Sequence, residues 1–185
     1  MSENIPKQEA QDKQRFNGNV RLAREQDLVF LKPILETWIR DRNTNQLIPE
    51  EIEEVLSSVM GSIKYTNNAR YLVAEKTDGE AIGMLGLRPP EERMLSYAST
   101  ESPIEMITAY VAKDQRGGKG VGKALVSKGE ELARQRGNTE IIFNSGPRYR
   151  FSGWPIWMAM FGKPIAIAKG YYGEGGDAMV WRKLL

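Results

Sequence analysis

The chain has 185 residues, with 26 Lys and Arg against 24 Asp and Glu, so its formal net charge is only +2. This length fits one ordinary domain with a full hydrophobic core, and the balanced charge gives no argument for binding nucleic acid or an anionic membrane surface. Because cysteine and histidine are absent, disulfides, a cysteine nucleophile, the commonest general base and the commonest metal ligand are excluded. Acid–base chemistry must therefore use Glu, Asp, Tyr, Lys, water or the substrate, and no metal site is expected.

Residues 1–17 are rich in Lys, Gln, Glu and Asn, and they lack the apolar core of a secretory signal. We expect a disordered N-terminal tail over residues 1–17 and a single folded domain over residues 18–185. No apolar run approaches the ~20 residues of a membrane span. The default location of such a chain is cytoplasmic.

A strand at residues 19–23 and two helices are expected first. Apolar residues recur at three- and four-residue spacing from Leu28 to Ile39, which indicates one helical face, and Pro33 marks a kink or a later start. Pro49 opens a second helix whose first turn is acidic. The acidic turn complements the helix dipole or, alternatively, attracts a cationic substrate.

Strands dominate the middle of the chain. Residues 70–75 and 81–87 are predicted to form a hairpin, because Asp78-Gly79 is a strong signal for a tight turn. A long loop over residues 89–102 separates this hairpin from a fourth strand at residues 103–113. The residues expected to share one face of that strand are Ile104, Met106, Thr108 and Tyr110.

The second half of the chain is predicted to alternate helices and strands. Gly137 is a natural end for a helix that begins near Lys123. The later elements expected are a strand at 140–144, a short helix at 155–161, and strands at 165–171 and 178–185. This alternation indicates one α/β domain around a central sheet.

A glycine-rich loop joins the fourth strand to the following helix. Glycine lets backbone N–H groups approach a ligand closely, and a helix N-terminus favours an anion. The loop therefore predicts a diphosphate cradle, and the alternative is a flexible turn with a solvated basic face. The glycines are Gly117, Gly118, Gly120 and Gly122, and the basic residues are Arg116, Lys119 and Lys123.

Two phosphate-binding families compete for this loop. Residues 117–124 read G-x-x-x-x-G-K-A, which nearly matches the P-loop pattern, but Ala124 replaces the hydroxyl residue that binds magnesium. A P-loop also normally follows the first strand of its domain, whereas this loop follows the fourth predicted strand. Both differences argue against the P-loop.

The second family fits better. Residues 111–125, VAKDQRGGKGVGKAL, resemble the acetyl-CoA signature of the GNAT acetyltransferases, in which a strand ending in a valine-like residue precedes [QR]-x-x-G-x-[GA] and a long helix. Arg116 lies one residue early, which implies one extra residue in the loop. The order of elements from about Val20 to Leu185 is also the GNAT order, and the closing AMVWRKLL resembles the family's last strand.

The resemblance implies an α/β fold with a GNAT-like mixed, mostly antiparallel central sheet of about seven strands, flanked by helices and splayed between the fourth and fifth strands. It implies an N-acetyltransferase that moves an acetyl group from acetyl-CoA, its co-substrate, to a primary amine of a small molecule, peptide or protein by direct attack. The alternatives are a P-loop-like nucleotide-binding protein and a non-catalytic acetyl-CoA-binding regulatory module. A homodimer stays open, and neither nucleic acid nor a membrane is expected as a partner.

The resemblance also implies the cofactor-binding residues. The pantetheine arm would bond to the backbone of the fourth strand, and the diphosphate would rest on the amides of residues 117–122. Asn144, at the end of the fifth strand, would contact the CoA arm or, alternatively, cap the strand. The complete set is Tyr110, Val111, Ala112, Arg116, Gly117, Gly118, Lys119, Gly120, Val121, Gly122, Lys123 and Asn144.

Three residues are candidates for catalysis. Glu105 occupies the position of a catalytic glutamate in the histone-modifying branch of the family, and it could take the proton that an ammonium of pKa ~10.4 must lose before attack. The alternative is an exposed strand carboxylate. Trp157 stands where many members carry a proton-donating tyrosine, and an indole is not a practical acid. Tyr149 and Tyr172, with its neighbour Tyr171, are substitutes, and water is the alternative acid.

In the family the acceptor enters between the first two helices and the last strands. Here that entrance involves residues 43–54 and 148–157. The aromatic residues of the second segment either line an apolar or cation-binding pocket or belong to the core. They are Phe151, Trp154 and Trp157.

Overall fold

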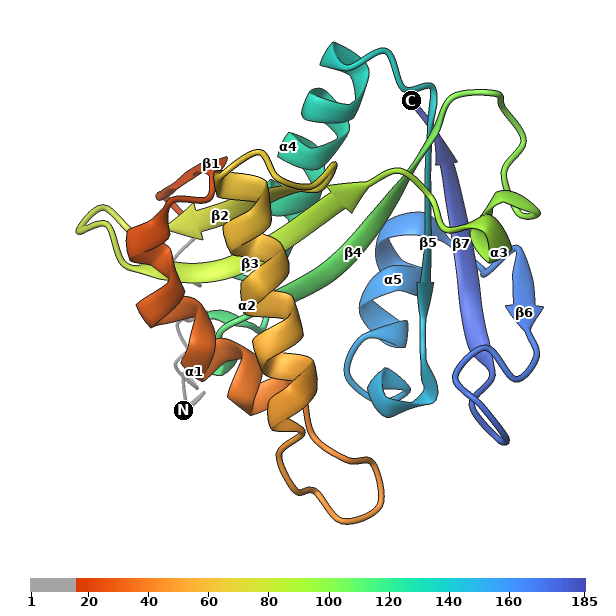
Figure 1. Ribbon diagram of the computed structural model, residues 1–185, viewed down its shortest axis with the longest axis horizontal. Coiled ribbons are helices and arrows are strands. Elements are labelled where there is room, and N and C mark those ends of the chain that lie inside the picture. Colours follow the sequence, from red (N-terminus) through yellow and green to blue (C-terminus); the bar gives the residue numbers. More distant parts are fainter. Residues whose placement is uncertain (1–15) are drawn as a thin grey trace, which may run out of the picture.

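A seven-stranded sheet runs through the computed structural model, which describes residues 16–185 (Figure 1). Its strand order is β1-β2-β3-β4-β5-β7-β6, and every neighbouring pair is antiparallel except the parallel pair β4 and β5. This mixed sheet confirms the predicted fold class. The strands are β1 (Asn19–Leu22), β2 (Arg70–Glu75), β3 (Ala81–Arg88), β4 (Pro103–Val111), β5 (Glu140–Ser145), β6 (Ala166–Ala168) and β7 (Ala178–Leu184).

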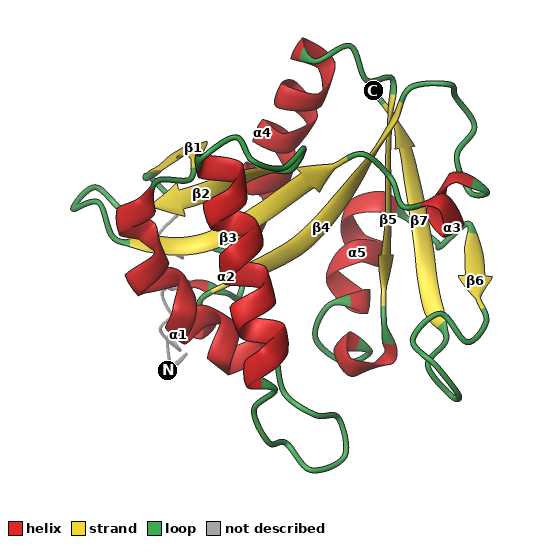
Figure 2. Ribbon diagram, viewed as in Figure 1, coloured by secondary structure: helices red, strands yellow, loops and turns green. Residues whose placement is uncertain are grey.

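Helices cover both faces of the sheet (Figure 2). α1 (Leu28–Trp38) and α2 (Pro49–Ile63) pack on one face, which we call the α1–α2 face. α4 (Val121–Gln135) and α5 (Trp154–Phe161) pack on the opposite face, which we call the α4–α5 face. Within residues 16–185, no helix is both long and apolar enough to cross a membrane.

Most predicted elements lie where the sequence places them, but several bounds differ. The strands predicted at 103–113 and 165–171 span only Pro103–Val111 and Ala166–Ala168. Pro33 lies inside α1 without ending it, and α4 begins at Val121 rather than near Lys123. The segment expected to be a loop contains a one-turn helix, α3 (Glu92–Leu95), because Met94 is fully buried against the sheet. Of the predicted tail, residues 1–15 lie outside the described residues, and Phe16 donates its N–H to the Lys119 carbonyl at 2.7 Å.

The fourth and fifth strands separate after a short stretch of pairing. β4 and β5 pair only from Pro103–Glu140 to Glu105–Ile142, although β4 continues to Val111. On its other edge, β5 pairs with β7 along its whole length. The remaining half of β4 therefore has a strand on one side only, which is the predicted splay.

A β-bulge interrupts β4 within this unpaired half. Met84 of β3 faces Tyr110, whereas Gly86 faces Ile107, so β4 carries one residue more than β3 across this interval. Thr108 adopts a positive φ of 45° there. An extra residue reverses the alternation of side chains beyond it. Ile104 and Met106 consequently pack on the α4–α5 face, but Tyr110 packs on the α1–α2 face, so the prediction of one shared face was wrong.

A buried carboxylate holds the loop that leads into β4. Glu140, at the start of β5, is fully buried, and it accepts hydrogen bonds from the N–H and hydroxyl of Ser99 at 2.8 and 2.7 Å. The N–H of Thr100 donates to the same carboxylate at 3.1 Å. Burial alone would raise the pKa of Glu140, but these hydrogen bonds outweigh it and hold the pKa below its usual value.

Candidate active site

A cavity of about 970 Å³ opens where β4 and β5 diverge. Its walls come from α2, the open half of β4, the segment after β5, the start of α5 and the loop between β6 and β7. The predicted site residues in its lining are Glu105, Tyr110, Val111, Arg116, Gly122, Asn144, Tyr149 and Tyr172. The others, Ala112, Gly117, Gly118, Lys119, Gly120, Val121 and Lys123, lie outside the lining.

The glycine loop exposes its backbone amides. Gly117, Gly118 and Gly120 have φ values of 82°, 90° and 92°, which non-glycine residues rarely adopt. The first bond of α4 runs from the Ala124 N–H to the Gly120 carbonyl at 2.9 Å, and within residues 16–185 no acceptor faces the amides of residues 117–123. A Cβ atom added at Gly117, Gly120 or Gly122 would meet nothing within 4 Å. This open set of amides at a helix N-terminus fits the diphosphate of CoA.

The backbone of Val111 faces the splay. Val111 lies opposite Gly83 of β3, and the next residue, Ala112, donates its N–H to the Ile82 carbonyl at 2.9 Å. In an antiparallel pair, hydrogen-bonded and non-hydrogen-bonded positions alternate, so Val111 and Gly83 form a non-hydrogen-bonded pair. The backbone N–H and carbonyl of Val111 therefore point away from β3. The backbone groups of Tyr110 and Ala112 point to β3. The expectation that all three residues offer backbone bonds to a pantetheine is therefore corrected to Val111 alone.

Two further side chains meet at this point of the cavity wall. The Val111 carbonyl accepts a hydrogen bond from the indole Nε1 of Trp38 at 2.9 Å. The Arg116 guanidinium lies 4.4 Å from the centroid of the Trp38 ring, and its Nη2 donates to the Ser152 carbonyl at 2.9 Å. Arg116 thus links the start of the glycine loop to the segment before α5, and burial lowers its pKa.

Glu105 is 1% exposed at the inner end of the cavity. The prediction's alternative of an exposed strand carboxylate is therefore wrong. Oε2 accepts hydrogen bonds from Arg88 Nε at 3.2 Å and from the Glu91 N–H at 3.1 Å, and no described residue donates to Oε1. Burial raises the pKa of Glu105, although the Arg88 charge opposes the rise. Oε1 is left to meet a ligand.

A hydrogen-bonded pair of phenols also lines the cavity. The hydroxyl oxygens of Tyr110 on β4 and Tyr149, in the 3-10 turn Pro147–Tyr149, are 2.8 Å apart. Arg148 Nη1 lies 3.4 Å from the Tyr149 oxygen and donates to both carboxylate oxygens of Glu51 at 2.8 and 2.9 Å. Burial raises the pKa of both tyrosines, so both phenols keep their protons at neutral pH.

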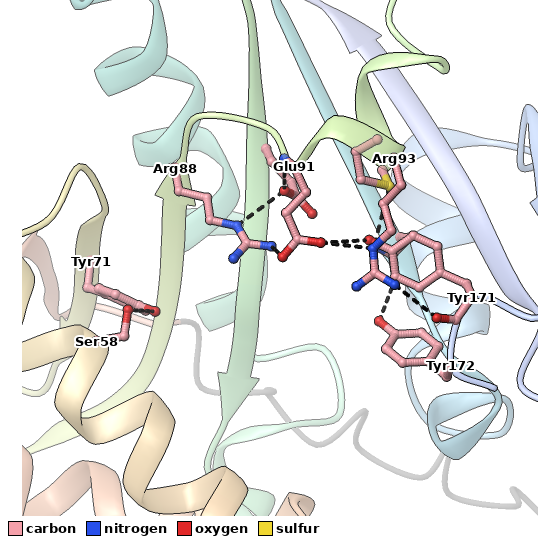
Figure 3. Close-up of polar contacts among 10 residues, drawn as sticks. Ser58, Tyr71, Arg88, Glu91, Arg93, Tyr171 and Tyr172 are labelled. Atoms are coloured by element: carbon pink, nitrogen blue, oxygen red, sulfur yellow. Dashed lines mark hydrogen bonds and ion pairs between the residues drawn. The ribbon is translucent and has the colours of Figure 1, made fainter.

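Tyr172 and Asn144 are bonded to each other. The Tyr172 hydroxyl donates to Asn144 Oδ1 at 2.6 Å. Beside them, Arg93 stacks 3.8 Å above the Tyr171 ring, and Figure 3 shows Glu91 between Arg93 and Arg88. Desolvation raises the pKa of Tyr172, and it raises the pKa of Tyr171 to about 12.

The three aromatic residues in and before α5 lie in different surroundings. Trp157 packs edge-on against Phe143 with ring centroids 5.0 Å apart, and it also reaches the cavity. Trp154 packs against the core and donates Nε1–H to the Ser145 carbonyl at 3.1 Å. Phe151 is 91% exposed and outside the cavity lining. Trp154 and Trp157 therefore belong at least partly to the core.

Several residues of this site carry no signal in the sequence. Trp38 falls within the predicted first helix and Arg88 follows the predicted strand at residues 81–87, and no local motif marks either of them. Thr108 was expected to be an ordinary strand residue. The Tyr71 hydroxyl donates to the Ser58 hydroxyl at 3.0 Å, as Figure 3 shows, and both residues line the cavity.

Several solved structures share this fold. A GNAT-family acetyltransferase of Desulfovibrio desulfuricans superposes with a TM-score of 0.71 at 17% identity, over 90% of this chain and 98% of that one. The ribosomal-protein-alanine N-acetyltransferase of Brucella melitensis gives 0.63 at 22% identity, over 90% and 99%. An acetyltransferase of Salmonella typhimurium, solved with its cofactor acetyl-CoA, gives 0.63 at 17% identity, over 91% and 94%.

The sequence itself identifies the family. No curated protein matches the chain in a sequence comparison. The family model described as the acetyltransferase (GNAT) family matches residues 33–148, which is more than half of the chain and includes the glycine loop, Glu105 and the start of the segment after β5. The P-loop alternative is excluded by this match together with the sheet topology. The chain belongs to the GNAT family of acetyl-CoA-dependent acetyltransferases.

Proposed function

We propose that the protein transfers the acetyl group of acetyl-CoA to a primary amine by direct attack, with Glu105 as the base and Tyr149 as the acid. The observation that carries the proposal is the presence of a buried carboxylate, Glu105, and a half-buried phenol, Tyr149, in the lining of one cavity. That cavity adjoins the open amides of the glycine loop. Acetyl-CoA supplies a thioester carbonyl, and the chain has no cysteine that could carry an acyl intermediate.

Glu105 accepts a proton from the acceptor ammonium, directly or through water. Its Oε2 is held by Arg88 and by the Glu91 N–H, so Oε1 is the atom that takes the proton. Burial raises the pKa of Glu105, which brings it closer to that of the amine and improves it as a base. The neutral amine nitrogen then attacks the thioester carbon. As the tetrahedral intermediate collapses, the carbon–sulfur bond breaks and the amide nitrogen gives its second proton to solvent water, which also takes the proton from Glu105 and reprotonates Tyr149 after turnover.

Tyr149 gives a proton to the departing thiolate. Its phenol is protonated at neutral pH, and Tyr110 and Arg148 hold the oxygen in place. After the transfer, the Arg148 cation stabilises the phenolate. Tyr172 is the second candidate for this acid, and its hydroxyl already donates to Asn144. We therefore assign the acid to Tyr149 first.

Backbone groups provide most of the proposed contacts to acetyl-CoA. The amides of residues 117–122 hold the diphosphate, with Lys119 and Lys123 as nearby positive charges, and the Val111 N–H faces the thioester and stabilises the oxyanion of the tetrahedral intermediate. The Val111 carbonyl has a second lone pair for the pantetheine beside the Trp38 bond. Asn144 is placed to contact the CoA arm from the other side of the splay.

Release of free CoA with a panel of amines tests the proposal. The panel contains a peptide with a free N-terminal alanine, an N-blocked lysine peptide, spermidine, tyramine and kanamycin. Turnover of any member supports the enzyme and identifies its acceptor class. Acetyl-CoA binding by calorimetry without CoA release for every amine would contradict the proposal and favour a non-catalytic acetyl-CoA-binding module.

A further inference from the structure

The extra residue of the β4 bulge carries a side chain that its backbone disfavours. Thr108 has φ 45°, and a β-branched residue at positive φ is a conformational outlier. Backbone strain of this kind persists only where the surrounding structure imposes it, and it is found most often at functional sites. Thr108 lies between Glu105 and Tyr110 along β4, and all three line the cavity.

The Thr108 hydroxyl also lacks a partner. Oγ1 is buried, and within the described part of the chain it is the one buried side-chain nitrogen or oxygen without a hydrogen bond. Thr108 Oγ1 lies against Gly86 of β3: a Cβ atom added at Gly86 would come within 2.9 Å of this oxygen. Tyr71, whose ring also borders Gly86, donates its hydroxyl hydrogen to Ser58. An unpartnered buried hydroxyl is costly, so a residue such as valine would stabilise the fold better here.

The position of Thr108 relates this hydroxyl to the acceptor. A Cβ atom added at Gly86 would meet Tyr71 and Ile107 as well as Thr108 Oγ1. Because Tyr71 and Ile107 pack on the α1–α2 face, the hydroxyl lies on that side of the sheet, whereas the glycine loop begins the helix on the other side. Glu105, the proposed base, is three residues back along the same strand. A hydroxyl between the base and the α2 wall can accept from a donor that enters on the acceptor side.

We propose that Thr108 is a substrate-contacting residue whose Oγ1 accepts an N–H hydrogen bond from the acceptor amine. A rotation about its Cα–Cβ bond turns Oγ1 from Gly86 into the cavity. With one N–H bonded to Thr108 and another proton passed to Glu105, the nitrogen lone pair points away from both, toward the thioester carbon. This inference rests on the proposed acetyl transfer.

Steady-state kinetics of Thr108→Val test the inference, because valine keeps the branched shape and removes the hydroxyl. The probe is whichever amine of the panel wild type acetylates fastest. We expect kcat/KM for that amine to fall about tenfold, the loss of one substrate hydrogen bond, while the KM for acetyl-CoA stays unchanged. We also expect the melting temperature to rise by about 2–4 °C, because an unpartnered hydroxyl has been removed. Thr108→Ser retains the hydroxyl and should keep kcat/KM within about threefold of wild type.

Thr139→Val is the matched control, since its hydroxyl is remote from the cavity and bonds Thr100 Oγ1 at 2.9 Å. It should leave the kinetics unchanged. Wild-type kcat/KM in Thr108→Val would overturn the inference, and so would an equal loss in Thr108→Ser, which would trace the effect to bulge shape. A lower melting temperature for Thr108→Val would show that the Thr108 hydroxyl forms a stabilising hydrogen bond in the wild type, and this result would also overturn the inference. If the wild-type protein acetylates no amine of the panel, the proposed acetyl transfer itself is contradicted.

Discussion

The phenol oxygens of Tyr110 and Tyr149 are 2.8 Å apart, although β4 and β5 stop pairing at Glu105 and Ile142. One hydrogen bond thus reconnects the two sides of the splay beyond the point where the backbones separate. The contact depends on the bulge, because Tyr110 would face the other side of the sheet without the extra residue.

Replacing Tyr149 with phenylalanine should lower kcat by about 10- to 100-fold, because the proposed acid is removed while the ring remains. The KM for acetyl-CoA should stay near its wild-type value. The measurement is CoA release at saturating amine. Tyr65→Phe is the control, since Tyr65 is 72% exposed and far from the cavity lining. An unchanged kcat in Tyr149→Phe would return the role of acid to Tyr172 or to water.

Glu105→Gln should lower turnover about tenfold or more and leave acetyl-CoA affinity nearly unchanged. In wild type, kcat/KM should fall as the pH drops through the raised pKa of Glu105, since the base works only when it is deprotonated. The acid limb of the pH profile should therefore lie above the ordinary glutamate pKa of 4.5. Glu53→Gln, on the outer side of α2 with its side chain 63% exposed, is the control. A profile that is flat down to the ordinary value would remove Glu105 from the mechanism.

Gly122→Glu should abolish acetyl-CoA binding through bulk and charge repulsion at the diphosphate amides. The melting temperature should not change, because Gly122 is helical and a Cβ atom there meets nothing within 4 Å. Calorimetry with acetyl-CoA gives the affinity. Ser127→Glu adds the same charge further along α4 on an exposed site and should bind normally. Wild-type affinity in Gly122→Glu would mean that the diphosphate lies elsewhere.

Glu140→Gln should cost about 2–3 kcal/mol of folding free energy at neutral pH, because a buried carboxylate that accepts several hydrogen bonds loses its charge. The pKa of Glu140 is lowered in the folded state, so the carboxylate stabilises the fold above its unfolded pKa. That stabilisation is lost as the pH falls through the folded value. Urea unfolding at pH 7 and at acid pH should therefore show a large difference from wild type that shrinks in acid. A constant difference would contradict the assignment.

The helices, strands and glycine-rich loop could be predicted from local sequence. Apolar periodicity from Leu28 to Ile39, the Asp78-Gly79 turn and the glycines from Gly117 to Gly122 each impose a local geometry, and the structure has all three. Met94 could not be placed in this way, because only the sheet surface beneath it turns a polar stretch into the short helix α3.

The rest of the cavity was less predictable, because its contacts join distant parts of the chain. Arg88 and Glu105 are 17 residues apart, and Trp38 and Val111 are 73 residues apart, so no local pattern links them. The alternation along residues 103–113 was predicted for a regular strand. A single extra residue at Thr108 reversed it, and neither threonine nor its neighbours carry a sequence signal for a bulge.

The reversal at Thr108 divides the side chains of β4 between the two faces of the sheet. Ile104, Met106, Ala109 and Val111 pack on the α4–α5 face, whereas Ile107, Tyr110 and Ala112 pack on the α1–α2 face. In the proposed reaction, the first group supports the helix that begins at the diphosphate-binding loop, and the second group borders the acceptor. Amine preference can therefore be redesigned on one side of this strand while coenzyme affinity is conserved on the other, as long as the number of residues between Ile107 and Tyr110 stays the same.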